Sequence, residues 1–222
     1  MRVAVKKDGS GRAALLVSLL CSWLLLSCAP SEAPEPAAAA EPIVPVSWVL
    51  DAAQSQVKLV SIKSSAFAET HHFTELAGDI NADGIAELLI NLDSIESGIA
   101  IRNERMREHL FETDRFAQAS ASMVVDMAWL RALPEGSETL TTVAIDLDLH
   151  GAQQGFKAEL SVIKLADQSL VISTSAPVLV RAGDFAMVPG IEKLAELAGL
   201  PVIASAVPVT VHLHFKPVVD DE

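Results

Sequence analysis

Three segments of the chain alternate apolar and polar residues with a period of two. In residues 143–149 every second residue is aliphatic, and residues 209–215 and 86–92 repeat the pattern. The apolar sets are Val143, Ile145, Leu147 and Leu149; Val209, Val211, Leu213 and Phe215; and Leu88, Ile90 and Leu92. Such alternation predicts β-strands with one buried face. We expect further strands at residues 47–51, 56–63, 72–81, 118–126, 154–165 and 169–180.

Two segments carry helical spacing instead, at residues 99–111 and 190–199. In the first, one face holds Ile99, Asn103, Met106 and Leu110, and we expect it to close over an apolar interior. In the second, the apolar stripe is Ile191, Leu194, Ala195 and Ala198. The sequence therefore predicts one or two short helices within a chain that is otherwise built of strands.

A second stripe on the first helix holds Arg102, Arg105 and His109. One interpretation is a solvated flank with ion pairs between Glu104 and Arg107 and between Arg105 and Glu108, three residues apart. The other is a cationic surface that meets a partner or the head group of a ligand. The spacing alone leaves both interpretations open.

The many half-apolar strands indicate an all-β fold, either a sandwich or a closed barrel, because each sheet must cover its apolar face. The chain holds three Trp, seven Phe and no Tyr, so these faces are mainly aliphatic. With few bulky aromatic side chains to fill a small lumen, the composition weakly favours a barrel with room inside.

The first 27 residues have the pattern of a secretory signal. Four basic residues and one acid precede or flank the start of an apolar run at residues 13–26, which is too short to span a bilayer of about 30 Å. The run ends in Leu25-Leu26-Ser27-Cys28, which resembles the bacterial lipobox. After cleavage Cys28 is the one remaining cysteine, so it has no disulfide partner and we expect it to carry the lipid anchor.

Residues 28–46 form a Pro/Ala/Glu-rich stretch that lacks the large apolar residues of a core, and we expect an extended tether there. Ala29 after the cysteine resembles a sorting signal for the outer membrane. We therefore expect a lipid-anchored protein of the bacterial cell envelope that faces the periplasm, with a globular domain at residues 47–217 and an acidic tail at 218–222.

Charge excludes one class of partner. The net charge of the 222-residue chain is −13, and it becomes −16 without residues 1–27. Such a surface repels phosphate backbones, and the chain has few aromatic side chains to stack on bases. Nucleic acid is not an expected partner.

The motifs that could carry chemistry are weak. Residues 79–84, DINADG, match the opening of a calcium loop, but Ile90 stands where the loop needs its final Glu, so a hairpin turn is the better interpretation. His212 and His214 share one strand face without an evident third ligand, which favours surface residues over a metal site. No nucleophile elbow, Cys pair or dinucleotide fingerprint is present, so we expect neither an enzyme nor a cofactor.

Residues 94–116, SIESGIAIRNERMREHLFETDRF, resemble the signature of the YceI-like family of lipid- and polyisoprenoid-binding proteins. The family pattern runs S-I-x-T-G, three residues, R-D-x-H-L, then F-F-D and a short run to Y-P. The matching residues are Ser94, Ile95, Ser97, Gly98, Arg102, Phe111, Glu112 and Phe116. Asn103, Arg105, Met106 and Ala117 replace the family's Asp, His, Leu and Pro.

Three further motifs agree with the family in order. Residues 47–57 resemble its opening W-x-I-D-x-x-H-S-x-I, residues 146–151 its L-T-L-H-G strand, and residues 181–187 its late R-x-D-F-G. The resemblance covers residues 47–217, and the changed polar positions indicate a divergent branch.

This resemblance implies an elongated antiparallel β-barrel of the lipocalin-like kind, with the helix near its mouth and an apolar lumen that holds an isoprenoid chain. The implied function is non-catalytic binding or sequestration of a long-chain isoprenoid or similar lipid. We expect Leu88, Ile90, Met106, Val143, Ile145, Leu147, Val211 and Leu213 to line the lumen. A structural or protein-interaction module with a self-filled barrel remains the alternative, and protein partners are unknown.

Overall fold

The computed structural model describes residues 47–64 and 66–218. The expected signal peptide at 1–27, the anchor Cys28, the tether at 28–46 and all but the first residue of the tail lie outside these residues. Those assignments, and the domain bounds that depend on them, stay predictions.

Twelve strands make up one sheet. They are β1 (Ser47–Leu50), β2 (Gln56–Lys63), β3 (Phe67–Phe73), β4 (Leu76–Ile80), β5 (Ile85–Asn91), β6 (Ile95–Glu96), β7 (Gln118–Val124), β8 (Glu138–Leu149), β9 (Ala152–Lys164), β10 (Leu170–Thr174), β11 (Val178–Arg181) and β12 (Ala206–Val218). The helices are α1 (Ala100–Arg105), α2 (Met127–Ala132) and α3 (Val188–Leu197). Short helical turns are η1 (Ala52–Gln54), η2 (Leu92–Ser94) and η4 (Ala182–Phe185), and η3 (Met106–Phe111) is a π-helix.

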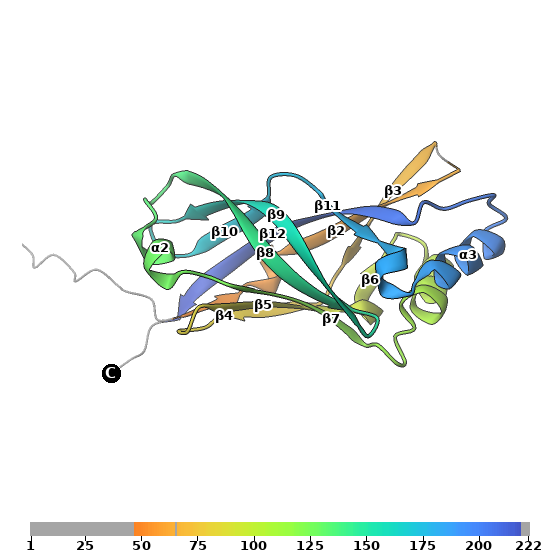
Figure 1. Cartoon of the computed structure of the whole chain (residues 1–222), viewed down its shortest axis with the longest axis horizontal. Helices are drawn as coiled ribbons and strands as arrows, with labels where there is room; N and C mark the ends of the chain where they lie inside the picture. The colour runs from red at the N-terminus through yellow and green to blue at the C-terminus, as the bar shows by residue number, and fades with distance from the viewer. Residues whose placement is uncertain (1–46, 65, 219–222) are drawn as a thin grey trace, which may run out of the picture. The chain divides into compact units, whose positions relative to one another are not determined.

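Eight of the strands close into an antiparallel barrel. The ring runs β1, β4, β5, β7, β8, β9, β10, β12, and β12 returns to β1 by pairing Val218 with Ser47. The sheet continues beyond this ring. β2 pairs with the same edge of β12 as β1 does, but further toward its N-terminal end, with Val209 opposite Leu59, and β3 and β6 follow β2. The predicted all-β barrel is therefore confirmed (Figure 1).

Two predicted strands are wrong as single elements, because the chain changes partners within them. The strand expected at residues 72–81 is broken at Thr74 and Glu75, where Ser94 accepts from Thr74 and Glu75. On one side of the break β3 pairs with β2 and β6, and on the other β4 pairs with β1 and β5. The strand expected at 169–180 is likewise split into β10 and β11, with Pro177, which has no N–H to donate, in the break.

The alternation of the sequence follows the barrel wall. Along β8 the odd-numbered residues from Thr139 to Leu149 are half-buried or buried, and every even-numbered residue is exposed. The predicted hairpin at residues 79–84 is also present, with Gly84 at φ +81° and the Asn81 side chain accepting from the backbone of Ile85 at 2.9 Å. A side chain at position 84 would meet the Val125 carbonyl oxygen.

The helical segment predicted at 99–111 forms α1 and continues as the π-helix η3. Asn103 and Met106 are buried and Leu110 is half-buried, as its apolar face predicts, but Ile99 is the N-cap residue and is 48% exposed. Asn103 is buried because its side chain has polar partners, accepting from Ser97 N at 2.9 Å and donating to Glu96 at 3.0 Å.

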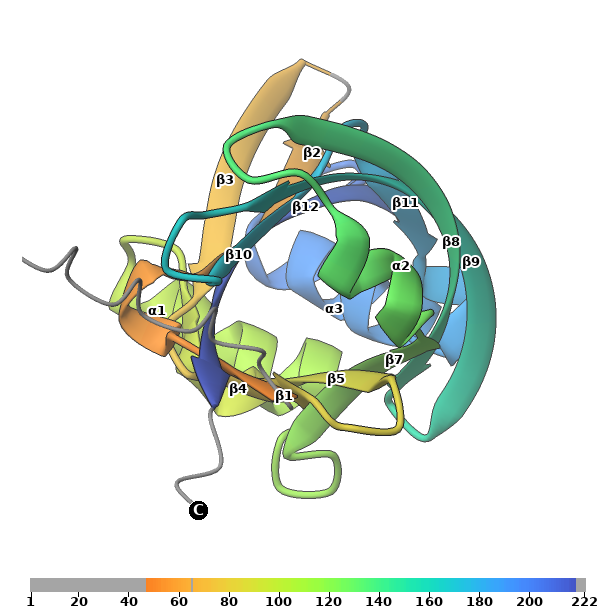
Figure 2. The same cartoon turned by 90° about the vertical axis from the view of Figure 1, so that its left-hand side faces the viewer.

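The helices lie at the two ends of the barrel. α1, η3 and α3 cover one end, while α2 lies across the other (Figures 1 and 2). Periodicity did not predict α2, which has only six residues. Its local signal is Asp126, whose side chain caps the helix by accepting from Ala128 N and Trp129 N at 2.9 and 3.1 Å.

Gly190 sets the packing of α3 on η3. A Cβ at this position would lie 2.4 Å from the His109 carbonyl oxygen and 2.9 Å from Leu110 Cα. We predict that Gly190→Ala lowers the unfolding free energy by about 1 to 3 kcal/mol, because α3 must move away from η3. Urea titration monitored by circular dichroism measures this change.

Gly155→Ala is the matched control, since a Cβ there meets only Asp146 Oδ1 at 3.6 Å. Equal stability of the two variants would show that the close approach of α3 to η3 is not a constraint on the fold.

Candidate functional site

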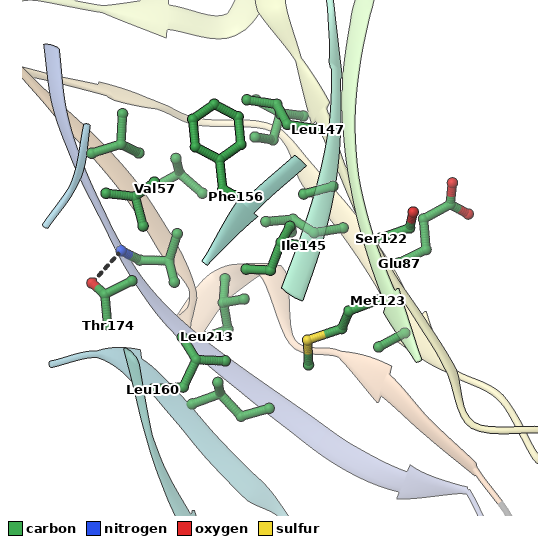
Figure 3. Close-up of a pocket in the computed structure, with 18 of the residues that line it drawn as sticks. Val57, Glu87, Ser122, Met123, Ile145, Leu147, Phe156, Leu160, Thr174 and Leu213 are labelled. Atoms are coloured by element: carbon green, nitrogen blue, oxygen red, sulfur yellow. Dashed lines mark hydrogen bonds between the residues drawn. The ribbon is translucent and has the colours of Figure 1, made fainter. Parts of the chain in front are cut away.

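A central cavity of about 150 Å³ lies within the barrel. Its wall is almost wholly aliphatic and comes from strands on all sides of the ring, with Phe156 and Phe215 as the aromatic members. In Figure 3 the side chains of Met123, Ile145 and Leu213 point toward one another, while the oxygen atoms of Glu87 and Ser122 point away from the apolar side chains.

Six of the eight predicted lumen residues line this cavity: Leu88, Ile90, Ile145, Leu147, Val211 and Leu213. Val143 lines a second cavity and Met106 a third. The structure therefore places all eight on cavity walls, but they line three cavities rather than one. Their contact with a lipid stays a prediction.

The second cavity, of about 280 Å³, lies toward the α2 end of the barrel. It shares four wall residues with the central cavity, Ile80, Met123, Leu160 and Ile172, so the two are contiguous. The pairing of β7 with β8 ends at Ser122 and Asp146, although β8 continues to Glu138. Trp129 and Leu130 of α2 fill part of the opening that results.

The third cavity, of about 130 Å³, lies beneath α1, η3 and α3. Its lining is largely apolar, with Leu59, Met106, Phe111 and Ile191 among its members, but it also carries five polar side chains. These are Ser61, Lys63, His71, Arg102 and Arg105. It is thus the polar end of a mainly apolar interior.

Arg102 is held at this end by Ser97 of the signature stretch and by Glu69 of β3. Its guanidinium donates to Ser97 Oγ at 2.9 Å and to the Ser97 carbonyl oxygen at 2.6 Å, and it forms an ion pair with Glu69. Glu69 also pairs with Lys63, and the hydrogen bond from Lys63 lowers the pKa of Glu69. One carboxylate therefore serves two cations.

The predicted cationic stripe is divided by the structure. Arg102 and Arg105 line the third cavity, whereas His109 lines a groove of about 580 Å³ between η3 and α3. The expected pairs of Glu104 with Arg107 and of Arg105 with Glu108 are not among the ion pairs of the described residues. Arg107 instead lies 3.5 Å from Asp93, and Arg105 donates to the Leu197 carbonyl oxygen at 3.1 Å.

His71 is a site residue that the sequence did not reveal. It is 2% exposed, and Nε2 lies 2.8 Å from Ser61 Oγ, whereas Nδ1 is buried with no hydrogen-bond partner among the described residues. Burial, reinforced by the charge of Arg102, lowers the pKa of His71 to about 4. The imidazole is therefore neutral at pH 7.

Further wall residues of the central cavity were also missed, including Val57, Met123, Phe156, Leu160, Ile172 and Val180. For Val57 the sequence did hold a signal. The strand at residues 56–63 was predicted with its observed bounds, and period two places Val57, Leu59, Ser61 and Lys63 on one face of it. His71 had no such signal, because the strand predicted there began at residue 72.

The paired histidines of β12 differ in exposure. His212 is exposed and its Nδ1 lies 2.8 Å from Ser173 Oγ, but His214 is half-buried and its Nδ1 is covered. The expectation of two surface residues thus holds for His212 and not fully for His214. Within the described part of the chain, no three side chains of His, Cys, Asp or Glu come together to hold a metal ion.

None of the helices among residues 47–64 and 66–218 is long and apolar enough to cross a membrane.

Comparison with known proteins gives both a family and a similar structure. The model of the YceI-like domain family matches residues 48–215. A solved polyisoprenoid-binding domain from Saccharophagus degradans, implicated in plant cell wall breakdown, is 36% identical, with a TM-score of 0.76. The match covers 79% of this chain and all of that domain.

BcnA from Burkholderia cenocepacia is 17% identical with a TM-score of 0.59, over 74% of this chain and 98% of BcnA, and shows the fold alone. No curated protein matches the chain significantly.

The buried neutral His71 makes stability depend on pH. The pKa of His71 is about 4 in the folded state and about 6.5 in the unfolded state. The contribution of the neutral imidazole to the unfolding free energy is therefore complete above pH 6.5 and is lost as the pH falls toward 4. We predict that the unaltered protein loses about 2 to 3 kcal/mol more unfolding free energy than His71→Gln between pH 7 and pH 4.5. Urea titrations at the two pH values measure it.

His72→Gln is the control, because His72 lies on the opposite face of β3, and it should keep the pH dependence of the unaltered protein. If His71→Gln also keeps it, His71 is not the group that is buried in its neutral form.

Proposed function

The chain belongs to the YceI-like domain family, and on that basis we propose that it binds a long-chain isoprenoid or a similar apolar lipid inside its barrel. The observation that carries this proposal is the aliphatic interior that runs through contiguous cavities from the barrel centre to the α2 end. The polyisoprenoid-binding domain of Saccharophagus degradans supports the choice of ligand class.

Energetics favour a long chain over a small apolar molecule. Each buried methylene contributes about 0.8 kcal/mol, while association costs at least about 4 kcal/mol and often more than twice that. About ten buried carbons therefore only offset a cost of about 8 kcal/mol, and micromolar binding needs about 15 even at the lowest cost. The central cavity alone has roughly the volume that holds one benzene molecule, so a chain of that length must extend into a neighbouring cavity.

The three cavities are evidence against the alternative of a self-filled barrel. A barrel that served only as a structural or interaction module would gain stability by packing its lumen to the density of a protein core. Here the wall residues Ile145, Leu147 and Val211 remain half-buried although they point inward. Side chains that are only partly covered leave contact area for a ligand.

A catalytic role is not supported by the polar end of the interior. Ser61 and His71 are paired as a nucleophile and a base would be, but among the described residues no carboxylate accepts from His71 Nδ1. A histidine with a pKa near 4 is also a weak base. We therefore propose binding without catalysis.

For the location, we propose a lipid anchor at Cys28 and a place in the bacterial envelope, at the outer membrane and facing the periplasm. The supporting features are the signal-like residues 1–27, the lipobox-like sequence before Cys28 and the proline-rich stretch to residue 46. An anchored barrel could then receive or hold a lipid close to the membrane.

The lumen proposal predicts different effects for two neighbours on β8. Ile145 lines the central cavity and Asp146 is exposed on the outer face. Ile145→Trp should fill the cavity and remove most co-purified lipid, whereas Asp146→Asn should leave the lipid content unchanged. Mass spectrometry of organic extracts measures the lipid, and circular dichroism confirms that each variant is folded.

Equal lipid content in two folded variants would place the ligand elsewhere. If the unaltered protein carries no lipid and takes up none, the binding function itself is wrong and the interaction module is the better interpretation.

The anchoring proposal predicts that Cys28→Ser abolishes lipidation, because serine lacks the thiol to be acylated. The variant should stay uncleaved or leave the outer-membrane fraction, as measured by fractionation and by the mass of the mature protein. Cys21→Ser lies within the expected signal and should change neither. A processed and membrane-bound Cys28→Ser protein would contradict the anchor.

A further inference from the structure

The barrel wall has a gap between β7 and β8 at the α2 end. The two strands pair over three residues and part after Ser122 and Asp146, whereas β8 runs on to Glu138. β7 supplies no partner beyond this point, because the chain turns away after Val124 and forms α2. In the described part of the chain, the edge of β8 before Asp146 therefore has no strand beside it on this side.

The gap leads into the second cavity, which is contiguous with the central one. Trp129 of α2 and Val143 of β8 both line the second cavity, so it reaches from the helix to the free part of β8. The outer surface beside the gap is also apolar. Val124 and Leu140, on the two strands that flank it, are 84% and 67% exposed, and Ile85, opposite Val124, is 49% exposed. An apolar chain would therefore meet apolar side chains on both sides of the wall.

α2 lies across this end of the barrel and is held mainly at its two ends (Figure 2). Just before the helix, Val125 N donates to the Gly84 carbonyl oxygen at 2.7 Å, and beyond it Gly136 N donates to the Lys164 carbonyl oxygen at 2.8 Å. Within residues 47–64 and 66–218, the barrel makes one hydrogen bond to the helix itself, from Lys164 Nζ to the Arg131 carbonyl oxygen at 2.7 Å. A helix of six residues is not stable without such contacts.

Lys164 ties the closed position of α2 to the burial of a charge. Lys164 follows Leu160 and Val162 on the inward face of β9 and is only 7% exposed. Its ammonium has three donors, and its one acceptor among the described residues is the carbonyl oxygen of Arg131 in the last turn of α2. A buried charge is unfavourable unless it is paired, so the closed helix supplies the partner that the ammonium needs.

Opening at this end requires less disruption than opening at the other. Leu130 is 2% exposed and lines the second cavity beside Trp129, so these two side chains block the passage from the gap. Their withdrawal breaks no strand pairing, because β7 and β8 are already apart there. The opposite end is covered by α1, η3 and α3, and α3 packs so closely on η3 that a Cβ at Gly190 would lie 2.4 Å from the His109 carbonyl oxygen.

We propose that the lipid chain enters and leaves the barrel through the gap between β7 and β8, and that α2 is the lid that closes it. Leu130 and Trp129 block the passage in the closed state. Lys164 holds the C-terminal end of the lid, and Asp126 keeps the lid helical by capping its N-terminal end. This inference rests on the proposed function and adds the route by which the ligand reaches the site.

The test measures the rates of farnesol uptake and release by stopped flow, with the delipidated mature protein and the fluorescence of Trp48 and Trp129. Lys164→Met removes the hydrogen bond to the lid, and Asp126→Ala removes the cap. We expect each change to raise both rates about five-fold, because the lid opens more often. The dissociation constant should stay within about two-fold, because a lid speeds entry and exit alike.

Asn91→Ala is the matched control at the opposite end. Asn91 caps η2 as Asp126 caps α2, its side chain accepting from Asp93 N at 3.0 Å, and η2 lies against η3 through Asp93 and Arg107. Its removal should leave both rates unchanged. Urea titration checks the fold of each variant. Lys164→Met replaces a buried charge by an apolar side chain, which often leaves a fold equally stable, so faster exchange there cannot come from general unfolding.

The outcomes separate this inference from the proposed function. Unchanged rates in the folded α2 variants would overturn the lid and leave lipid binding intact. Faster uptake in Asn91→Ala, and not in the α2 variants, would overturn it in favour of entry beneath α1 and α3. Weaker binding at an unchanged uptake rate would show that α2 is a fixed part of the wall. Failure of farnesol to bind the unaltered protein would overturn the lipid-binding function together with the lid.

Discussion

β12 holds the barrel closed, because its two edges hydrogen-bond to four strands. One edge pairs with β2 and then β1, and the other with β11 and then β10. The same strand supplies the wall of two cavities through its inward residues Val207, Val209, Val211, Leu213 and Phe215. A shift of one residue in its register would turn His212 and His214 inward, so closure and an apolar lumen depend on one pairing.

The two ends of this barrel differ in a way that fits a ligand with two ends. At the α2 end the cavity wall is mainly aliphatic, and the helix inserts Trp129 and Leu130. At the opposite end α1 is joined to α3 by the hydrogen bond from Arg105 to Leu197, and η3 is joined to α3 by the close approach of Gly190 to His109. The signature residues Ser97 and Arg102 fix the same end from the strand side. The charged helix thus both closes the barrel and supplies Arg102 and Arg105 to its polar wall, while β2 and β3 supply the rest.

Period-two alternation predicted most of the strands and the direction in which their side chains point, but not β6 or residues 67–71 of β3. Val143, Ile145 and Leu213 lie on cavity walls, as the alternation predicts, because a strand places alternate side chains on opposite faces. It could not predict where a strand changes partners, as at Thr74 or Pro177, since that depends on pairing between residues distant in sequence. It also could not divide the lumen into three cavities, because the divisions come from helices that fold back over the barrel ends.

The polar wall was beyond prediction for the same reason. His71 and Arg102 belong to segments about thirty residues apart, and only the pairing of β3 with β2 and β6 brings them to one cavity. The sequence signature identified Arg102 through its resemblance to a family motif. The structure adds its partners, which show that Ser97 and Glu69 hold Arg102 in the wall.

Nuclear magnetic resonance of methyl-labelled protein with bound farnesol tests most directly whether the lipid chain binds in the barrel interior. Binding in the lumen predicts nuclear Overhauser effects from the chain to the methyl groups of Ile145, Leu147 and Leu213. It predicts none to Leu140, which lies on the outer face of β8 and is 67% exposed. Contacts with Leu140 and not with the three inward residues, at saturating farnesol, would contradict it.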